Sequence, residues 1–189
     1  IYPRQVEMVL KHAWARHTRA VVFTSSTSVY AEGQFPATED QALNPEKSSG
    51  KALIQAEALV RQVYPKRHVI LRLAGLMGPN RHPGRFFAGK SGLKGGGSPV
   101  NFVHLNDCIL AIDWLVEKEC WSETFNLCSP EHPAKKDFYT FAAKSGEYDL
   151  PEFSDEEMGG KSVSSEKIIR QAGYKFVFNN PIDALDFCS

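Results

Sequence analysis

The chain has 189 residues, of which 42% are hydrophobic and 23% are charged, and its formal net charge at pH 7 is zero. A neutral chain lacks the basic balance of a nucleic-acid-binding protein, and no apolar run in it approaches the roughly 20 residues that span a bilayer. We therefore expect a protein with one sizeable core, or one core and a smaller lobe, that binds neither nucleic acid nor membrane.

The cysteines indicate the cellular compartment. Cys108, Cys120, Cys128 and Cys188 form no C-x-x-C pair and lie in apolar or helix-like surroundings. This spacing disfavours a disulfide framework or a metal site and favours buried, reduced thiols in a cytoplasmic protein. The chain begins with Ile1 inside a helix-like segment and lacks the sectors of a signal peptide. We expect a fragment, or a natural protein that extends before this residue.

Hydrophobic periodicity and chain-breaking residues predict the secondary structure. Apolar residues recur near the helical period over 3–16, which indicates an amphipathic helix, and a β-branched and aromatic run over 20–26 indicates a buried strand. The following predicted elements are a loop at 31–47, a helix from 48 to about 63, a strand at 68–75, a glycine-rich excursion at 78–99, a strand at 100–105, a helix at 106–118 capped by Asn106, a strand at 124–129, a helix at 133–146, a loop at 147–163, a short helix stopped by Gly173, and one turn after Pro181.

This order of elements predicts the fold class. Strands that alternate with helices at such spacing favour an α/β fold with a parallel sheet, and the material after Ser129 is expected to form a smaller lobe. The excursion at 78–99 is long for a loop inside a compact domain, and loops of that length are usually functional.

Four segments in order resemble the extended short-chain dehydrogenases, the Rossmann-type family that includes nucleotide-sugar epimerases and dehydratases. They are TSSTSVY after a strand, SGKALIQAE on the next helix, LRLAGLMGP at the next strand end, and VNFVHLNDCILAI. The resemblance covers nearly the whole chain and the last two thirds or so of such a protein. It implies the C-terminal part of a Rossmann-type doubly wound parallel sheet with a smaller α+β substrate lobe. The sheet and its helices would comprise 1–75 and 100–128, and the lobe 76–99 and 129–189.

One feature of the family is missing. Its Gly-rich turn, where the first strand meets the first helix and backbone approaches the cofactor pyrophosphate, has no counterpart here. The stretch GKSGLKGGGS is rich in glycine, but it follows no strand and opens no helix, so it fits a flexible loop. Tight dinucleotide binding by this chain alone is therefore not expected.

The resemblance also implies a catalytic pair. In the family a Tyr phenol acts as acid and base, and a Lys four residues later lowers its pKa and holds the nicotinamide ribose. Alignment on Glu57 places Ser49 at the Tyr position and Leu53 at the Lys position, and neither side chain has that chemistry. Lys51 lies about 200° round the helix from Ser49 and cannot substitute. The pair is therefore predicted to be degenerate.

Two other interpretations of this stretch remain open. Ser48 and Lys51 match the S-x-x-K motif of penicillin-recognising enzymes, but no S-D-N or K-T-G motif completes that set. The hydroxyls of Ser48 and Ser49 also suit the first turn of a helix as caps, which is compatible with a degenerate site.

The resemblance assigns roles to further residues. Ser26 takes the position of the catalytic Ser/Thr that hydrogen-bonds the reacting oxygen, and Ser28 faces substrate. Cofactor contacts are implied at Thr24, Ser25, Ser49, Leu53, Ala74, Gly75 and Leu76. Strand-end hydroxyls that satisfy a turn are the plainer reading of the serines.

Substrate contacts are implied around the glycine-rich excursion. Arg81 and Arg85 would receive an anionic group, although solvated loop arginines are the commoner case. His104 would brace the strand-to-helix turn or line the edge of the substrate pocket. Gly75 stands where nucleotide-sugar epimerases often have Asn, which argues against a nucleotide-sugar ligand.

The expected function is that of a cytoplasmic, NAD- or NADP-binding oxidoreductase or epimerase with a small-molecule substrate and a weakened active site. The alternative is a non-catalytic NADP-binding sensor or an interaction protein on the same fold. The resemblance further implies a homodimer in which the helices at 3–16 and 48–63 pair with their copies. No metal is expected, because no third ligand accompanies His104 and Asp107.

Overall fold

The computed structural model of this chain describes residues 1–41 and 43–188. In chain order its elements are α1 Tyr2–Ala15, β1 Val21–Ser26, η1 Thr27–Val29, α2 Ser48–Val63, β2 His68–Leu73, β3 Gly75–Met77, η2 Pro83–Phe86, β4 Phe102–His104, α3 Leu105–Glu117, β5 Glu123–Leu127, α4 Lys135–Ser145, α5 Glu166–Ala172 and η3 Leu185–Phe187. The predicted helices and strands are all confirmed to within a few residues. The predicted loop at 31–47 contains residue 42, which lies outside the described residues.

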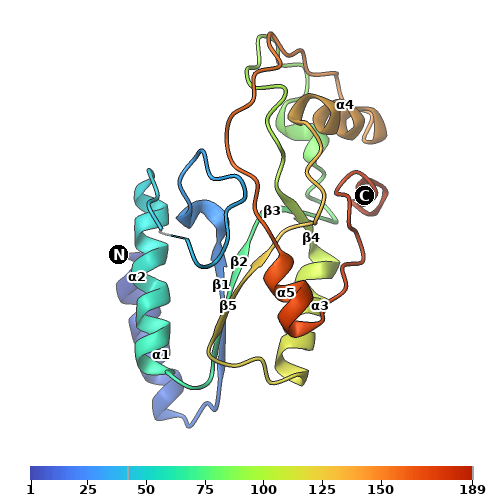
Figure 1. Ribbon diagram of the computed structural model, residues 1–189. Helices are drawn as coiled ribbons and strands as arrows, with labels where there is room; N and C mark the ends of the chain where they lie inside the picture. The colour runs from blue at the N-terminus through green and yellow to red at the C-terminus, as the bar shows by residue number, and fades with distance from the viewer. Residues whose placement is uncertain (42, 189) are drawn as a thin grey trace.

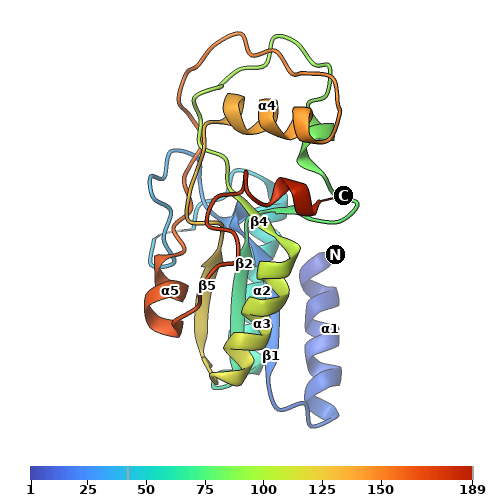
Figure 2. The same cartoon turned by 90° about the vertical axis from the view of Figure 1, so that its right-hand side faces the viewer.

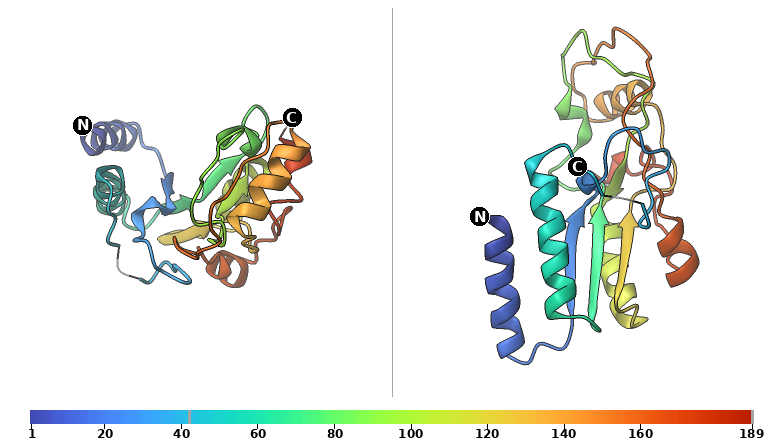
Figure 3. Two further views of the ribbon diagram at one scale, coloured as in Figure 1. Left: turned by 90° about the horizontal axis from the view of Figure 1, so that it is seen from above. Right: turned by 60° about the vertical axis from the view of Figure 1, so that its left-hand side comes forward.

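The strands form two parallel sheets, and the right-hand view of Figure 3 shows the three strands of the larger sheet side by side. Its order is β1-β2-β5, and its register places Ser25 opposite Arg72, and Arg72 opposite Asn126. The smaller sheet pairs β3 with β4, with Gly75 opposite Phe102. Parallel neighbours need a crossover connection, which α2 provides between β1 and β2. The carboxyl ends of the three long strands therefore lie at one edge of the sheet.

Helices cover both faces of the larger sheet (Figure 1). α1 and α2 lie side by side on one face, where Leu10, Val60 and Ile70 are buried together. α3 covers the opposite face, where Leu71 and Leu115 belong to the main core. This double covering of a parallel sheet confirms the predicted doubly wound α/β fold.

The smaller lobe lies beyond the carboxyl ends of the strands (Figure 2). Aromatic residues of β4 and α4 form its core, with Phe102 and Phe138 stacked at a centroid distance of 4.8 Å. The glycine-rich segment runs beside residues 149–155, because the backbone N–H groups of Gly89 and Leu93 donate to the carbonyls of Asp149 and Glu152, both at 3.1 Å. η2, inside the same segment, packs against α4.

α5 packs against β5, and Ile168 belongs to the core of the large sheet rather than to that of the smaller lobe. Among the described residues, no helix is both long enough and apolar enough to cross a bilayer.

Two predicted helix caps are wrong. α3 begins after His104, whose Nδ1 accepts a hydrogen bond from the N–H of Asn106 at 3.1 Å, so the cap is His104 and not Asn106. α2 begins at Ser48 and has Lys47 as its N-cap, without a side-chain capping bond. Ser48 therefore already has helical geometry and does not cap the helix.

Candidate functional site

The candidate site lies at the carboxyl ends of β1 and β2, where η1, β3 and the first turn of α2 meet. Ser26 ends β1, and its Oγ accepts a hydrogen bond of 3.2 Å from the N–H of Ser28, which starts the turn of η1. Ser26 and Ser28 are half-buried, and Thr24 is exposed on the same strand. Ligands of open α/β sheets bind beyond the carboxyl ends of the strands, which is where these hydroxyls lie.

A buried ion pair lies directly beneath this edge. Glu57 of α2 and Arg72 of β2 have side chains that are 0% and 3% exposed. Arg72 donates Nε to Oε1 of Glu57 at 3.0 Å and Nη2 to Oε2 at 2.8 Å, which is a bidentate arrangement. Ser25 donates its hydroxyl to the same Oε1 at 2.7 Å, and Arg61 donates to Oε2 at 3.2 Å. α2 is thereby fixed to β1 and β2.

The electrostatics of this cluster favour a charged Glu57. Burial by itself disfavours the carboxylate, but the hydrogen bonds from Arg72 and Ser25 and the charges of Arg72 and Arg61 together outweigh it. The pKa of Glu57 therefore lies below its ordinary value. A buried carboxylate whose two oxygens already accept hydrogen bonds from Arg72, Ser25 and Arg61 suits a structural role.

The network extends across the sheet to β5. Arg72 donates Nη1 to the Tyr30 hydroxyl at 2.8 Å, and that hydroxyl donates to Oδ1 of Asn126 at 2.8 Å. The Asn126 N–H donates to Oε1 of Glu39 at 2.7 Å. Burial raises the pKa of the Tyr30 phenol, only partly offset by Arg72 and Asn126. Tyr30 is a buried core residue with both hydroxyl partners inside the protein, and it is not a proton donor for the site.

The first turn of α2 lies close to the chain that follows β1. A Cβ added to Gly50 would lie 2.6 Å from the carbonyl oxygen of Ser28 and 2.5 Å from Cβ of Pro45, so only glycine allows this approach. Ser49, at the family's Tyr position, is exposed. Leu53, at the Lys position, is half-buried and packs against the main core. Ser49 is thus on the first turn of α2, which lies beside Ser28, and Leu53 is one turn further along the helix; neither carries a titratable side chain.

Small and apolar residues form the surface beside β3. The Ala74 N–H donates to the carbonyl of Leu127 at 3.0 Å, which ties the end of β2 to β5. Gly75 is exposed, and a Cβ there would lie 2.9 Å from the carbonyl oxygen of Asn101. Leu76 exposes 39% of its surface. Gly75 and Leu76 therefore present a small and an apolar surface at this edge.

The two arginines predicted at the substrate lie in the loop after β3. Arg81 donates Nε to the carbonyl oxygen of Leu76 at 2.9 Å, so it is held near β3. Arg85 donates Nη1 to the carbonyl oxygen of Asn80 at 3.2 Å and is exposed. His104 is 1% exposed, and besides capping α3 it lies 3.2 Å from the carbonyl oxygen of Phe187 through Nε2. Of the two roles foreseen for His104, the structural one matches its surroundings.

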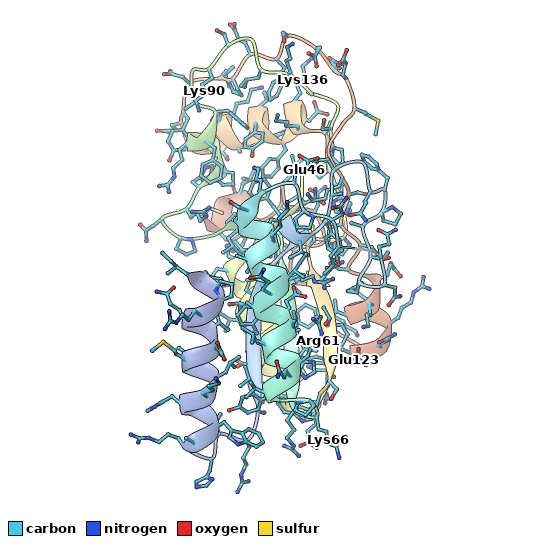
Figure 4. The ribbon with its side chains drawn as sticks, turned by 90° about the vertical axis from the view of Figure 1, so that its left-hand side faces the viewer. Glu46, Arg61, Lys66, Lys90, Glu123 and Lys136 are labelled. Atoms are coloured by element: carbon cyan, nitrogen blue, oxygen red, sulfur yellow. The ribbon has the colours of Figure 1, made fainter. Side chains whose placement is uncertain are left out.

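A cavity of about 120 Å³ lies beside η1 and the start of α2. Its walls are Ser28, Tyr30, Glu32, Glu46, Lys47 and Lys161. Figure 4 shows Glu46 at the end of α2 nearest the lobe. Lys161 donates Nζ to Oε1 of Glu32 at 2.9 Å and to the carbonyl oxygen of Tyr30 at 3.4 Å. Asn101 holds this segment, because its Nδ2 donates to the Lys161 carbonyl at 2.7 Å and its Oδ1 accepts from the Val163 N–H at 2.8 Å.

The Glu57–Arg72 pair and the position of Lys161 were not predicted from the sequence. A signal for the pair exists, because Arg72 is a lone charge in an apolar strand and Glu57 lies on the buried stripe of its helix. A buried charge is stable only with a partner. Lys161 has no comparable signal, because its neighbours in the sequence are polar and its contacts come from residues about 130 positions away.

No family model matches the chain. Protein YeeZ of Escherichia coli K12 is 36% identical over 183 residues, which are 96% of this chain and 66% of YeeZ. The chain therefore spans just under two thirds of that relative's length.

Solved structures show the same fold. UDP-glucuronic acid 4-epimerase from Bacillus cereus, in complex with NAD, superposes with a TM-score of 0.80 at 20% identity, covering 96% of this chain and 64% of the epimerase. UDP-N-acetylglucosamine 4-epimerase from Bacillus cereus gives 0.80 at 17% identity, covering 96% and 66%. A conserved protein of unknown function from Silicibacter pomeroyi gives 0.78 at 22% identity, covering 93% and 68%. The chain thus has the Rossmann-like α/β fold of epimerases, and likeness at these identities concerns the fold alone.

Proposed function

We propose that this chain belongs to an NAD- or NADP-binding protein of the extended short-chain dehydrogenase type. It would contribute the part of the active site at the carboxyl ends of the strands, together with the substrate lobe. The observation that carries the proposal is the meeting of Ser26, Ser28 and the first turn of α2 at the carboxyl ends of two parallel strands, with Gly75 and Leu76 open beside them. The structural likeness to an epimerase in complex with NAD supports it.

The residues present suit one part of such a cofactor. A nicotinamide ring would lie against Ala74, Gly75 and Leu76, where the surface is small and apolar, with Thr24 exposed on the neighbouring strand. The bound cofactor would supply hydride acceptance or donation. Ser26 would hold a reacting oxygen by hydrogen bonding, and Ser28 would contact the substrate from the floor of the 120 Å³ cavity.

The residues at the dyad positions do not suit catalysis. Leu53 offers no charge to hold a ribose or to lower a phenol pKa, and Ser49 has no base beside it among the described residues. We therefore derive no proton transfer at this site. Cofactor binding without efficient hydride transfer is the function that these side chains support best.

The second candidate is a non-catalytic NADP sensor or interaction protein, and the packing of Leu53 favours it. A leucine that contributes to the main core stabilises the fold, whereas a lysine there would need a partner. A sensor needs only that cofactor binding changes the accessible surface or the association of the protein.

We also propose that α1 forms a homodimer contact. Met8 and Val9, neighbours on this helix, are 65% and 68% exposed. Large apolar side chains exposed together on one helix are typical of an interaction surface. Sedimentation of the protein and of Val9→Glu tests this: a dimer that the substitution dissociates supports the proposal, and an unchanged monomer contradicts it.

The experiment that tests the proposed function is calorimetric titration of NADH and NADPH into the full-length protein and, in parallel, into this 189-residue chain. Binding by the full-length protein is expected, and absence of binding to both would refute the cofactor proposal. The variant Ser49→Tyr with Leu53→Lys separates the two candidates. Turnover of a carbonyl panel by this variant would favour a degenerate enzyme, and binding without turnover would favour a sensor. Gln55→Lys, which adds the same charge at an exposed position of α2, is the matched control.

A further inference from the structure

The smaller lobe contains a cavity of about 500 Å³ that no part of the proposed function uses. Two segments far apart in the sequence form it, namely the loop around η2 and the end of α4. The side chains that matter for its chemistry are those of Asn80, His82, Arg85, Ser145, Glu147 and Tyr148. We call it the lobe pocket. Its volume lies in the range of small-molecule sites.

The backbone around the lobe pocket is closely fitted. A Cβ on Gly84 would lie 2.3 Å from the carbonyl oxygen of Ala142. Because glycine has no side chain, η2 packs closely against α4 (Figure 2). Asn80 and Glu147, which both line the pocket, adopt φ values of 62° and 55°. Non-glycine residues in the left-handed region carry strain, and such residues cluster at ligand sites.

His82 presents a hydrogen-bond donor to the lobe pocket. Its Nδ1 accepts a bond of 3.1 Å from the N–H of Gly84, so in the neutral ring the proton is on Nε2. Burial lowers the pKa of His82, although the charge of Asp186 opposes this, and the ring is therefore neutral at pH 7. Nε2 lies 3.4 Å from the Ser145 hydroxyl, a long contact that a better acceptor would replace.

The geometry excludes a nucleophilic site. His82 donates toward Ser145 and so cannot act as its base. Burial raises the pKa of the Cys188 thiol, which also lines the cavity, to about 11, so it stays protonated. The lobe pocket therefore has the features of a binding site and not of a reaction centre.

Arg85 and Glu147 line the same pocket without forming an ion pair with each other, and the Arg85 guanidinium lies over the Phe86 ring at 5.9 Å from its centroid. Arg85 uses Nη1 for the carbonyl oxygen of Asn80, at 3.2 Å, and this leaves most of its donors free. Within the described residues, neither Arg85 nor Glu147 has an ion-pair partner. A cation and an anion that face one cavity without neutralising each other complement a ligand that carries both an anionic group and hydrogen-bond donors.

We propose that the lobe pocket binds a small hydroxylated anion, whose carboxylate or phosphate is held by Arg85 and the Nε2–H of His82 and whose hydroxyl donates to Glu147. The ring of Tyr148, 5.6 Å from that of His82, forms an apolar wall beside it. This site goes beyond the proposed function, and its occupancy does not require a nicotinamide cofactor.

Calorimetric or NMR titration of the full-length protein, without cofactor, tests the site with three probes. Gluconate supplies a carboxylate on a hydroxylated chain, glucose 6-phosphate supplies a phosphate, and sorbitol supplies the hydroxyls alone. We expect at least one of the two anions to bind, and the anion that binds more tightly identifies the preferred group. Sorbitol should bind at least about tenfold more weakly, because it lacks the charge-assisted bonds.

Substitutions locate the binding. Arg85→Gln should weaken anion binding by about tenfold to a hundredfold, and Arg85→Lys should give an intermediate loss because it keeps the charge without the fork. Lys144→Gln, which removes one exposed charge from the neighbouring turn of α4, should change nothing. Arg85 is exposed, so its variants are expected to fold, and a thermal melt confirms this.

Three results would overturn the proposal: no binding of either anion, equal binding of sorbitol, or anion binding that Arg85→Gln leaves unchanged. NADH affinity should be the same in Arg85→Gln and in the wild type. Failure of NADH to bind would refute the cofactor proposal and leave the lobe pocket to be judged by its own probes.

Discussion

Replacing Arg72 with methionine tests the buried pair beneath the candidate site. Arg72 donates two hydrogen bonds to Glu57, at 3.0 and 2.8 Å, and the two side chains are 3% and 0% exposed. In Arg72→Met the Glu57 carboxylate keeps its bonds from Ser25 and from the half-exposed Arg61 but loses both bonds of the guanidinium group. The Tyr30 hydroxyl loses a donor as well.

The expected loss follows from the cost of a buried charge without its partner. Removing one member of a buried ion pair lowers the free energy of unfolding by about 3–5 kcal/mol. The two bonds that remain on Glu57 place Arg72→Met near the lower end, at about 3 kcal/mol. For a chain of this size that corresponds to a fall in melting temperature of roughly 6–12 °C. Urea unfolding followed by circular dichroism, at pH 7, measures the difference directly.

The double variant Glu57→Leu with Arg72→Met should recover at least half of the loss, because it removes both buried charges. The pH dependence has a defined sign. In the wild type the pKa of Glu57 lies below its ordinary value, so the pair stabilises the fold above that ordinary value and loses its effect as pH falls through the lowered one. In Arg72→Met protonation of Glu57 relieves the penalty, so the difference from wild type should shrink between pH 7 and pH 5. A loss below about 1 kcal/mol, or no recovery in the double variant, would refute this reasoning.

Three further substitutions test the packing around the site and the lobe. Gly84→Ala should destabilise the protein by about 1–3 kcal/mol in thermal or urea unfolding, because its Cβ would meet the carbonyl oxygen of Ala142 at 2.3 Å; an unchanged stability would show that η2 can move. Asp107→Asn should lower the free energy of unfolding by about 1.5–3 kcal/mol, since its carboxylate accepts three hydrogen bonds from the C-terminal segment, and increased proteolysis of that segment is the second readout. Burial raises the pKa of Glu39, so the wild type loses stability as pH rises from the ordinary carboxyl range through the raised pKa. Glu39→Gln keeps an acceptor for the Asn126 N–H, and its free energy of unfolding should depend less on pH. Parallel pH profiles of the variant and the wild type would contradict this.

Local patterns in the sequence predicted the helices and the strands of the larger sheet, but not β3. The helix over 3–16 and the strand over 20–26 were predictable because apolar periodicity reports which face of a segment is buried. The N-cap of α3 was not predictable, because the cap is the Nδ1 atom of His104 and not one of the hydroxyl or amide side chains that are the commonest caps. The packing of α5 against β5 could not be predicted either, since an amphipathic helix shows that one face is buried but not against which element.

The candidate site shows the same division. Residue types alone predicted that hydroxyl residues end one strand, and the family resemblance placed Ser49 and Leu53 at the expected dyad positions. The contact of Arg72 with Glu57, and the cavity that Arg85 and Glu147 both line without pairing, exist only in the folded chain. Those relations join residues that are 15 and 62 positions apart in the sequence. The physical reason is that periodicity encodes burial, whereas the pairing of charges depends on distances that exist only after the chain has packed.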